Sequence, residues 1–115
     1  SAAALFEHLA REPQLFHMLL REQGTGSESW RRAIRTEIRY FTNELAEDLE
    51  RLGQEKGRPV VDAYTTADAM VAITFGGAGN VLSLSAESRA EFAARLVQQL
   101  RMIMLGSERM AERES

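Results

Sequence analysis

The strongest periodic pattern in the chain is an apolar stripe between residues 30 and 52. Its members are Trp30, Ile34, Ile38, Phe41, Leu45, Leu49 and Leu52. They recur at steps of three or four residues, which keeps their side chains on one face of an α-helix. We therefore predict a long amphipathic helix that is capped at Ser27 or Ser29 and ends near Gly53.

A second helical segment, from Ala67 to Leu82, is apolar around nearly its whole circumference and must be covered on every side. Thr65 or Thr66 is expected to cap its start. Each glycine inside the segment costs the helix about 1 kcal/mol relative to alanine, and close contact with other helices would offset that cost. Two interpretations follow, a central core helix within one chain and a helix in a dimer interface.

Two shorter segments near the start of the chain also have helical spacing. Ser1 to Ala10 places its apolar residues on one face, and the next segment begins at Pro13, a residue that suits the first turn of a helix. Further along, Gly57 and Pro59 predict a loop between residues 54 and 64.

The last predicted helix runs from about Ala86 to Met110, after a cap at Ser85. It has two neighbouring stripes, one of Phe92, Leu96, Gln99 and Ile103 and one of Val97, Leu100 and Met104. We interpret their two partners as the domain's own core and a second copy of the chain. Because no segment alternates as a half-buried strand does, we predict an all-α domain of about five helices.

Composition narrows the class of protein. The 115 residues have the length of a single domain, residues 1–115, and the absence of cysteine excludes disulfides and thiolate metal sites. A net charge of −3 argues against nucleic-acid binding through bulk charge. No apolar run reaches the roughly 18 residues of a membrane span, and no signal-peptide pattern occurs. We expect a soluble, cytoplasmic domain with no membrane partner.

Patterns that carry catalysis or metal binding are lacking. His8 and His17 are the only histidines, and their spacing matches no metal-ligand motif. The GGAGN run resembles a phosphate cradle only weakly, since it lies within an apolar helix instead of between a strand and a helix. A small helical enzyme would need a buried polar cluster that the sequence does not reveal. We therefore expect no enzymatic activity, no catalytic residue, no metal and no cofactor.

The polar face of the long helix carries charges of both signs. They are Arg31, Arg32, Arg35 and Arg39, among Glu28, Glu37, Glu44 and Glu47. We interpret them as solvated surface, because the interspersed carboxylates weaken the alternative of a phosphate-binding face. Asp48 and Glu50 extend the acidic residues, and nothing marks a buried acid–base pair among them.

Aromatic and flexible side chains lie on the predicted apolar stripes. They include Phe6, Phe16, Met18, Trp30, Phe41, Leu45, Met70 and Phe75. Such residues either fill a core or line a ligand pocket between helices, and composition alone does not separate the two.

Four segments in order resemble the C-terminal domain of TetR-family transcriptional regulators, with the FabR-like branch most similar. They are LLRE with its Gly/Ser-rich sequel, EIRYFTNEL, AMVAITFGGAG and RLVQQLRMIMLG. The resemblance covers almost the whole chain. It implies an effector-binding and dimerisation domain whose last two helices form a four-helix bundle with their copies. Operator DNA would be a partner only through an N-terminal helix-turn-helix domain, and no such pattern occurs in these residues.

The resemblance also implies an effector and residues that contact it. In the FabR-like branch the effector is a long-chain fatty acyl-CoA, and the controlled genes concern unsaturated fatty-acid metabolism. The implied ligand-binding residues are Phe6, Leu9, Phe16, Leu19, Leu20, Arg21, Ile34, Ile38, Phe41, Leu45, Ile73 and Phe75. Arg21 would meet the thioester or a phosphate, or pair with Glu22 or Glu37. The implied dimer interface contains Met70, Thr74, Gly77, Ala78, Val81, Phe92, Leu96, Leu100 and Ile103. The alternative is a helical dimerisation scaffold without a pocket.

Overall fold

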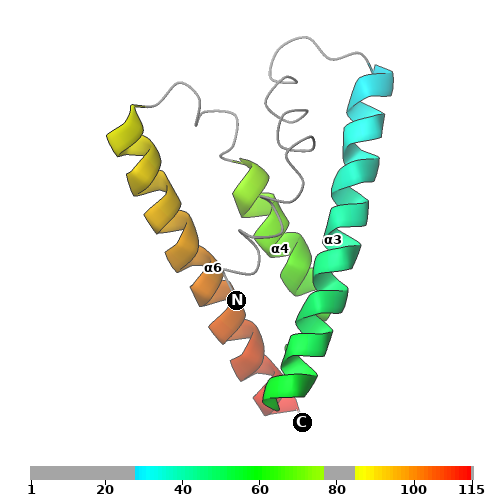
Figure 1. Cartoon of the computed structure of the whole chain (residues 1–115). Coiled ribbons are helices and arrows are strands. Elements are labelled where there is room, and N and C mark those ends of the chain that lie inside the picture. Colours follow the sequence, from blue (N-terminus) through cyan, green and yellow to red (C-terminus); the bar gives the residue numbers. More distant parts are fainter. Residues whose placement is uncertain (1–27, 77–84, 115) are drawn as a thin grey trace.

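The computed structural model describes residues 28–76 and 85–114, without the side chain of Trp30, and these residues form three α-helices. They are α3 (Glu28–Lys56), α4 (Ala63–Gly76) and α6 (Ala86–Glu114), shown in Figure 1. The described residues contain no strand, which confirms the all-helical class. The two helices predicted near the start of the chain lie outside the described residues, so the count of five helices stays a prediction.

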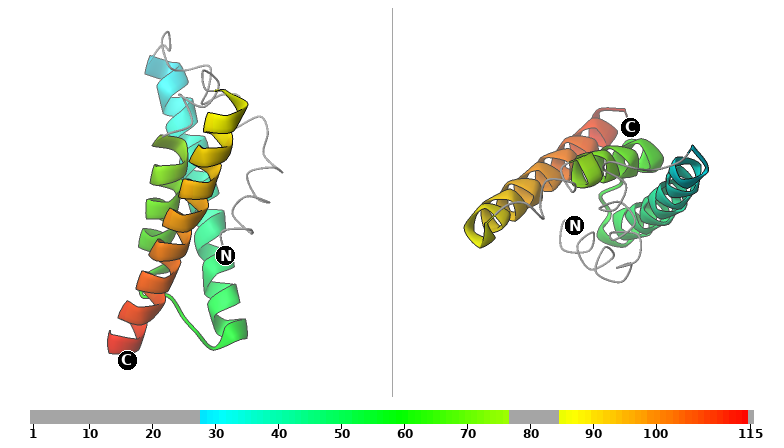
Figure 2. Two further views of the ribbon diagram at one scale, coloured as in Figure 1. Left: turned by 90° about the vertical axis from the view of Figure 1, so that its left-hand side faces the viewer. Right: turned by 90° about the horizontal axis from the view of Figure 1, so that it is seen from above.

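Helix α4 lies between α3 and α6 and runs antiparallel to both (Figures 1 and 2). Its last described turn reaches the level of Phe41, because the rings of Phe41 and Phe75 meet edge to face with their centroids 5.8 Å apart. At 1.5 Å per residue, α3 therefore extends past this end of α4 by roughly 20 Å.

The end of α3 differs from the prediction by three residues. The helix continues through Gly53 to Lys56 and stops at Gly57, whose φ of 66° is the left-handed conformation of a helix-ending glycine. The Arg58 N–H donates to the Gly53 carbonyl at 2.9 Å, and the Gly57 N–H donates to the Gln54 carbonyl at 3.3 Å. The prediction was wrong because Gly53 serves close packing: a Cβ there would lie 3.0 Å from the Pro59 Cα.

The start of α4 also differs from the prediction. Asp62 caps it, since its Oδ1 accepts a hydrogen bond from the Thr65 N–H at 3.0 Å. The Thr66 hydroxyl instead donates to the Asp62 carbonyl at 2.7 Å. A cap at Thr65 or Thr66 was therefore wrong, because the Asp62 carboxylate already accepts from the free N–H groups of the first turn.

The cap predicted for α6 is confirmed. The helix begins at Ala86, and the Ser85 Oγ accepts a hydrogen bond from the Ser88 N–H at 3.2 Å. It runs to Glu114, four residues beyond the expected end at Met110.

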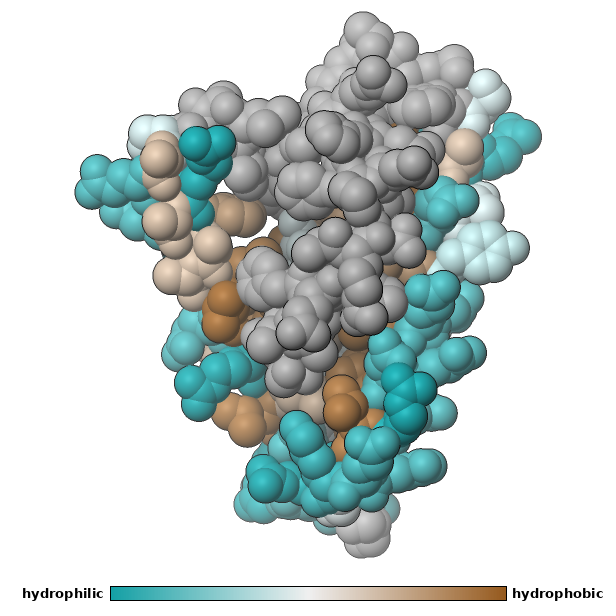
Figure 3. All heavy atoms as spheres, viewed as in Figure 1, coloured by the Kyte–Doolittle hydropathy of each residue, from teal (hydrophilic) through white to brown (hydrophobic). Residues whose placement is uncertain are grey.

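All three helices contribute to one apolar core. Its buried members are Phe41, Leu45, Ala46, Leu49, Ala63, Ala67, Met70, Val71, Leu96 and Leu100. In the space-filling view, apolar residues show along the middle of the molecule and hydrophilic residues along the outer side of α3 (Figure 3). The predicted α3 stripe is confirmed at Ile34, Phe41, Leu45 and Leu49, all of which are buried.

The structure does not confirm the two separate stripes predicted on α6. Leu96 and Leu100, which were assigned to different stripes, are both buried, whereas Gln99 is exposed. A single row at helical spacing continues from them to Ser107, because these positions face α4 together. Other apolar residues of α6 are exposed, namely Met102, Leu105 and Met110.

Candidate functional site

Six of the predicted ligand-binding residues fall within the described helices. Ile34, Ile38, Phe41 and Leu45 lie on α3, and Ile73 and Phe75 lie on the last turns of α4. The other six, Phe6, Leu9, Phe16, Leu19, Leu20 and Arg21, lie outside the described residues.

Five of these six residues meet in one apolar group. Phe41 and Leu45 belong to the buried core, and Ile38, Ile73 and Phe75 are partly buried against it. The edge-to-face pair of Phe41 and Phe75 joins α3 to α4 at this point. Ile34 is buried as well, 3% exposed, but lies outside this cluster. The partly buried members give the group an apolar surface at the end of α4.

The residues predicted for a dimer interface are divided by the structure. Met70, Thr74, Leu96 and Leu100 are buried within their own chain, so as placed they offer no surface to a second copy. Phe92 and Ile103 are partly buried. The remaining three, Gly77, Ala78 and Val81, lie outside the described residues.

A surface groove between α3 and α4, of about 480 Å³, has no counterpart in the sequence-based predictions. Its lining comprises Tyr40, Asn43, Glu44, Ala46, Glu47, Glu50, Ala63 and Tyr64. Tyr40 and Tyr64 lie far apart in the sequence, and no sequence pattern indicates that they line the same groove. None of the six described ligand-binding candidates lines this groove.

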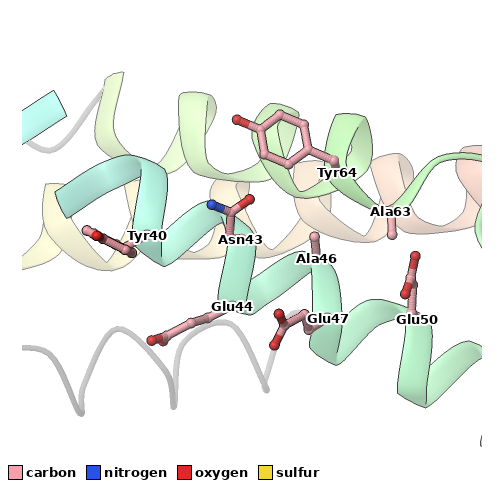
Figure 4. A pocket seen from close by; sticks show the side chains of 8 residues that line it. All are labelled: Tyr40, Asn43, Glu44, Ala46, Glu47, Glu50, Ala63 and Tyr64. Atoms are coloured by element: carbon pink, nitrogen blue, oxygen red, sulfur yellow. The ribbon is translucent and has the colours of Figure 1, made fainter. Parts of the chain in front are cut away.

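The polar groups of this groove do not converge. Asn43 and Glu50 point toward α4, whereas Glu44 and Glu47 point away from it (Figure 4). A neighbouring groove shares Glu50, Ala63 and Tyr64 with it. Among the described residues, no group of three histidine, aspartate or glutamate side chains is arranged to hold a metal ion. The groove therefore lacks the convergent polar set typical of a catalytic or metal centre.

A short chain of hydrogen bonds connects α6 to the start of α4. The Ser107 Oγ and the Thr66 Oγ1 are 2.7 Å apart, and both residues are buried. Because Thr66 uses its single proton on the Asp62 carbonyl, Ser107 is the donor between the two hydroxyls. The Ser107 Oγ in turn accepts from the Val61 N–H at 3.2 Å. Each hydroxyl of this pair is thus satisfied, and α6 is held to the loop before α4.

The carbonyl of Asp62 accepts the last hydrogen bond of this series, and the carboxyl group of the same residue has a lowered pKa. Hydrogen bonds from the backbone N–H and then the hydroxyl of Thr65 lower the pKa of the Asp62 carboxyl below its ordinary value. The carboxylate is exposed, so this shift reflects helix capping and not burial.

No protein-family model matches the chain, and no solved structure matches it significantly. Within residues 28–76 and 85–114, no helix combines the length and apolar character needed to cross a membrane.

Proposed function

We propose that this chain is the effector-binding and dimerisation domain of a TetR-family transcriptional repressor that senses long-chain fatty acyl-CoA and controls genes of unsaturated fatty-acid metabolism. The resemblance of four ordered segments supports the proposal, and three of them fall wholly or partly in α3, α4 and α6. In this role the chain catalyses no reaction. Operator DNA would contact a separate helix-turn-helix domain.

The observation that carries the proposal is the apolar group at the end of α4. Ile38, Ile73 and Phe75 are only partly buried there, beside the ring of Phe41. Each methylene of an acyl chain buried against such a surface contributes about 0.8 kcal/mol. Total area separates a saturated from a cis-unsaturated chain poorly, so shape must do so. A kinked chain would displace the ring of Phe75 from Phe41 where a straight chain would not.

Displacement of Phe75 would shift α4, and a shift of α4 would affect the rest of the domain. This helix contacts both α3 and α6, and the bond between Thr66 and Ser107 connects its opposite end to α6. An acyl chain that favours one position of α4 would therefore favour one placement of α6. A ligand that binds both placements equally would change nothing.

Dimerisation is supported by apolar and small residues that one chain leaves uncovered. Ala72 and Gly76 are exposed on α4, and Met102, Leu105 and Met110 are exposed on α6. We place a second copy against the exposed residues of α6, because Met70, Thr74, Leu96 and Leu100 are already buried in the core. Sedimentation of the wild-type chain and of Met102→Asp/Leu105→Asp tests it, with a shift to monomer expected.

The experiment that tests effector binding is calorimetry of the chain with stearoyl-CoA, oleoyl-CoA and free CoA. We expect both thioesters to bind, with different affinities, and free CoA to bind at least tenfold more weakly. Ile73→Asn, on the partly buried surface, should weaken thioester binding, whereas Tyr40→Asn on exposed α3 should not. Absence of heat with both thioesters, from a folded dimer, would contradict the acyl-sensing role.

A dimerisation scaffold without a pocket is the second candidate. It is favoured by the close packing of the core, in which Leu49, Met70 and Leu100 are at most 2% exposed. A dimer that binds no thioester in the same calorimetry would support it.

A further inference from the structure

The charges along α3 are segregated by sign. Between residues 29 and 43, a stretch that we name the basic half, the charged residues are Arg31, Arg32, Arg35, Glu37 and Arg39. Between residues 44 and 50, which we name the acidic half, they are Glu44, Glu47, Asp48 and Glu50. One helix therefore carries an excess of positive charge followed by negative charge alone.

The turns of α3 do not neutralise these charges themselves. Opposite charges three or four residues apart support a helix, and like charges at the same spacing destabilise it. Arg35 has an arginine four residues away on each side, and Glu47 has a glutamate three residues away on each side. Within the described residues, no ion pair involves Arg35, Arg39, Glu47 or Glu50. Repulsion within each half is therefore not offset by ion pairs of the described chain.

Both signs of charge share one face of α3. Arg35, Arg39, Glu47 and Glu50 are all exposed, and at 3.6 residues per turn they fall within an arc of about 120°. We name this arc the charged face. It borders the packed side of the helix, because Ala46, which lies in the same arc, is buried in the core.

The acidic half of the charged face also forms one wall of the groove between α3 and α4. Glu47 and Glu50 line the groove from α3, and Tyr64 lines it from α4 (Figure 4). The described lining residues include no lysine or arginine. A guanidinium group pairs with carboxylates and also stacks on tyrosine rings. The groove therefore suits an arginine side chain, and Arg39 of the same helix is about 12 Å from Glu47 along the axis.

We propose that the charged face binds the same face of a second copy of the chain, with the two α3 helices antiparallel about a twofold axis. The basic half of each copy then lies on the acidic half of the other. With the axis beside Asn43, Arg39 of one protomer lies opposite the partner's Glu47, because each is four residues from Asn43. Arg35 lies within one residue of the level of the partner's Glu50. Twofold symmetry makes each contact occur twice.

Charge complementarity selects a second copy over a polyanion. A nucleic-acid duplex attracted to the arginines would also meet Glu47 and Glu50, which repel phosphates. An antiparallel copy presents both signs in the reverse order. Exposed ion pairs each contribute little and are screened by salt, so we expect weak association that is confined to low ionic strength. This contact is separate from the one proposed on α6 and does not depend on the proposed function.

The test is sedimentation of the full 115-residue chain carrying Met102→Asp/Leu105→Asp, which removes the contact proposed on α6. We expect this parent variant to associate in about 0.01 M salt, where the Debye length is about 30 Å, and to be monomeric in about 1 M salt, where it is about 3 Å. Added to this variant, Arg35→Glu/Arg39→Glu makes the charged face acidic and Glu47→Arg/Glu50→Arg makes it basic. Each reversal should weaken association at least about tenfold, and mixing the two reversed proteins should restore it.

A matched control is Glu37→Arg/Glu55→Arg in the same parent variant. Both residues are exposed and lie on the other side of α3, and the charge change equals that of Glu47→Arg/Glu50→Arg. The control should associate at low salt as the parent does. Circular dichroism checks that the reversed proteins remain helical, and Arg35→Gln/Arg39→Gln replaces a reversal that disturbs folding.

Several results would overturn the inference. A parent variant that stays monomeric at low salt would do so, as would association of each reversed protein alone that matches the parent. Failure of the mixture to associate would show that the two halves do not pair. Binding of duplex DNA that requires Arg35 and Arg39, without self-association, would overturn the second copy as the occupant. The α6 contact is read separately from the wild type in about 1 M salt, where the charged face is screened.

Discussion

The two interfaces that α4 makes are built differently. Against α3, α4 packs apolar and small residues such as Ala63 and Ala67, and Gly53 allows close approach of the following loop. Against α6, the interface combines the buried Leu96 and Leu100 with the hydrogen-bonded hydroxyls of Thr66 and Ser107. Apolar packing is nondirectional and tolerates small adjustments, whereas hydrogen bonds hold a specific geometry. These hydrogen bonds therefore fix the register of α6 chiefly toward its C-terminal end.

The largest expected effects come from the apolar part of each interface. Leu49→Ala and Leu100→Ala each remove a side chain that is at most 2% exposed, so each should lower the free energy of unfolding by about 2 to 5 kcal/mol. Urea unfolding measures the loss. Tyr40→Ala, at a position 64% exposed, serves as the control and should change little. A small effect at Leu100 alone would mean that α6 adds little to the core.

Two glycines should respond to alanine with opposite signs. At Gly53, a Cβ would lie 3.0 Å from the Pro59 Cα and 3.1 Å from the Arg58 carbonyl oxygen, so overpacking should destabilise the protein by about 1 to 3 kcal/mol. At Gly106, inside α6, a Cβ meets nothing within 4 Å, and alanine should stabilise by about 0.5 to 1 kcal/mol. Thermal unfolding of the two variants checks the signs. Stabilisation by Gly53→Ala would refute the close approach.

Removal of one hydroxyl should test the polar part of the α4–α6 interface. Thr66→Val or Ser107→Ala leaves a buried partner less satisfied, at a cost of about 1 to 3 kcal/mol. The double variant should cost less than the sum of the two, because both changes break one bond. Thr36→Val is a matched control, since the Thr36 hydroxyl makes an exposed bond to the Arg32 carbonyl. Strict additivity would show that the two hydroxyls act independently.

The smallest expected effect concerns pH and the cap of α4. The pKa of Asp62 is lowered in the folded state by its hydrogen bonds with Thr65. Its contribution to stability is therefore present above the unfolded pKa, about 3.9, and is lost as the pH falls through the lower folded pKa. Asp62→Ala should lower Tm at pH 7, and the difference from wild type should shrink below pH 4. Ala72→Ser, an exposed change on the same helix that involves no titratable group, should show no such trend.

Several features of the fold could be predicted because they depend on local spacing or local hydrogen bonds. The α3 stripe from Ile34 to Leu49 is buried as expected, and Ser85 caps α6. Helix ends were less predictable where two residues competed for one role. Glycine is typical of helix ends, so Gly53 was expected to end α3, yet the helix ends at Gly57. Residue 53 is a glycine because a Cβ there would come too close to Pro59, and the sequence does not show that contact.

The candidate site depended more on tertiary structure. Phe41 and Phe75 were both assigned to the implied ligand site, and the structure brings their rings together. The groove between Tyr40 and Tyr64 was not expected, because nothing in either local sequence indicates which residues the other helix brings near.

The helical class, the buried side of α3 and the start of α6 could be predicted from the sequence, because periodicity and capping act within a few residues of the chain. Which row of α6 is buried, and that Ser107 bonds to Thr66, depend on tertiary contacts. These features depend on how the helices pack against one another, and that packing joins residues remote in sequence.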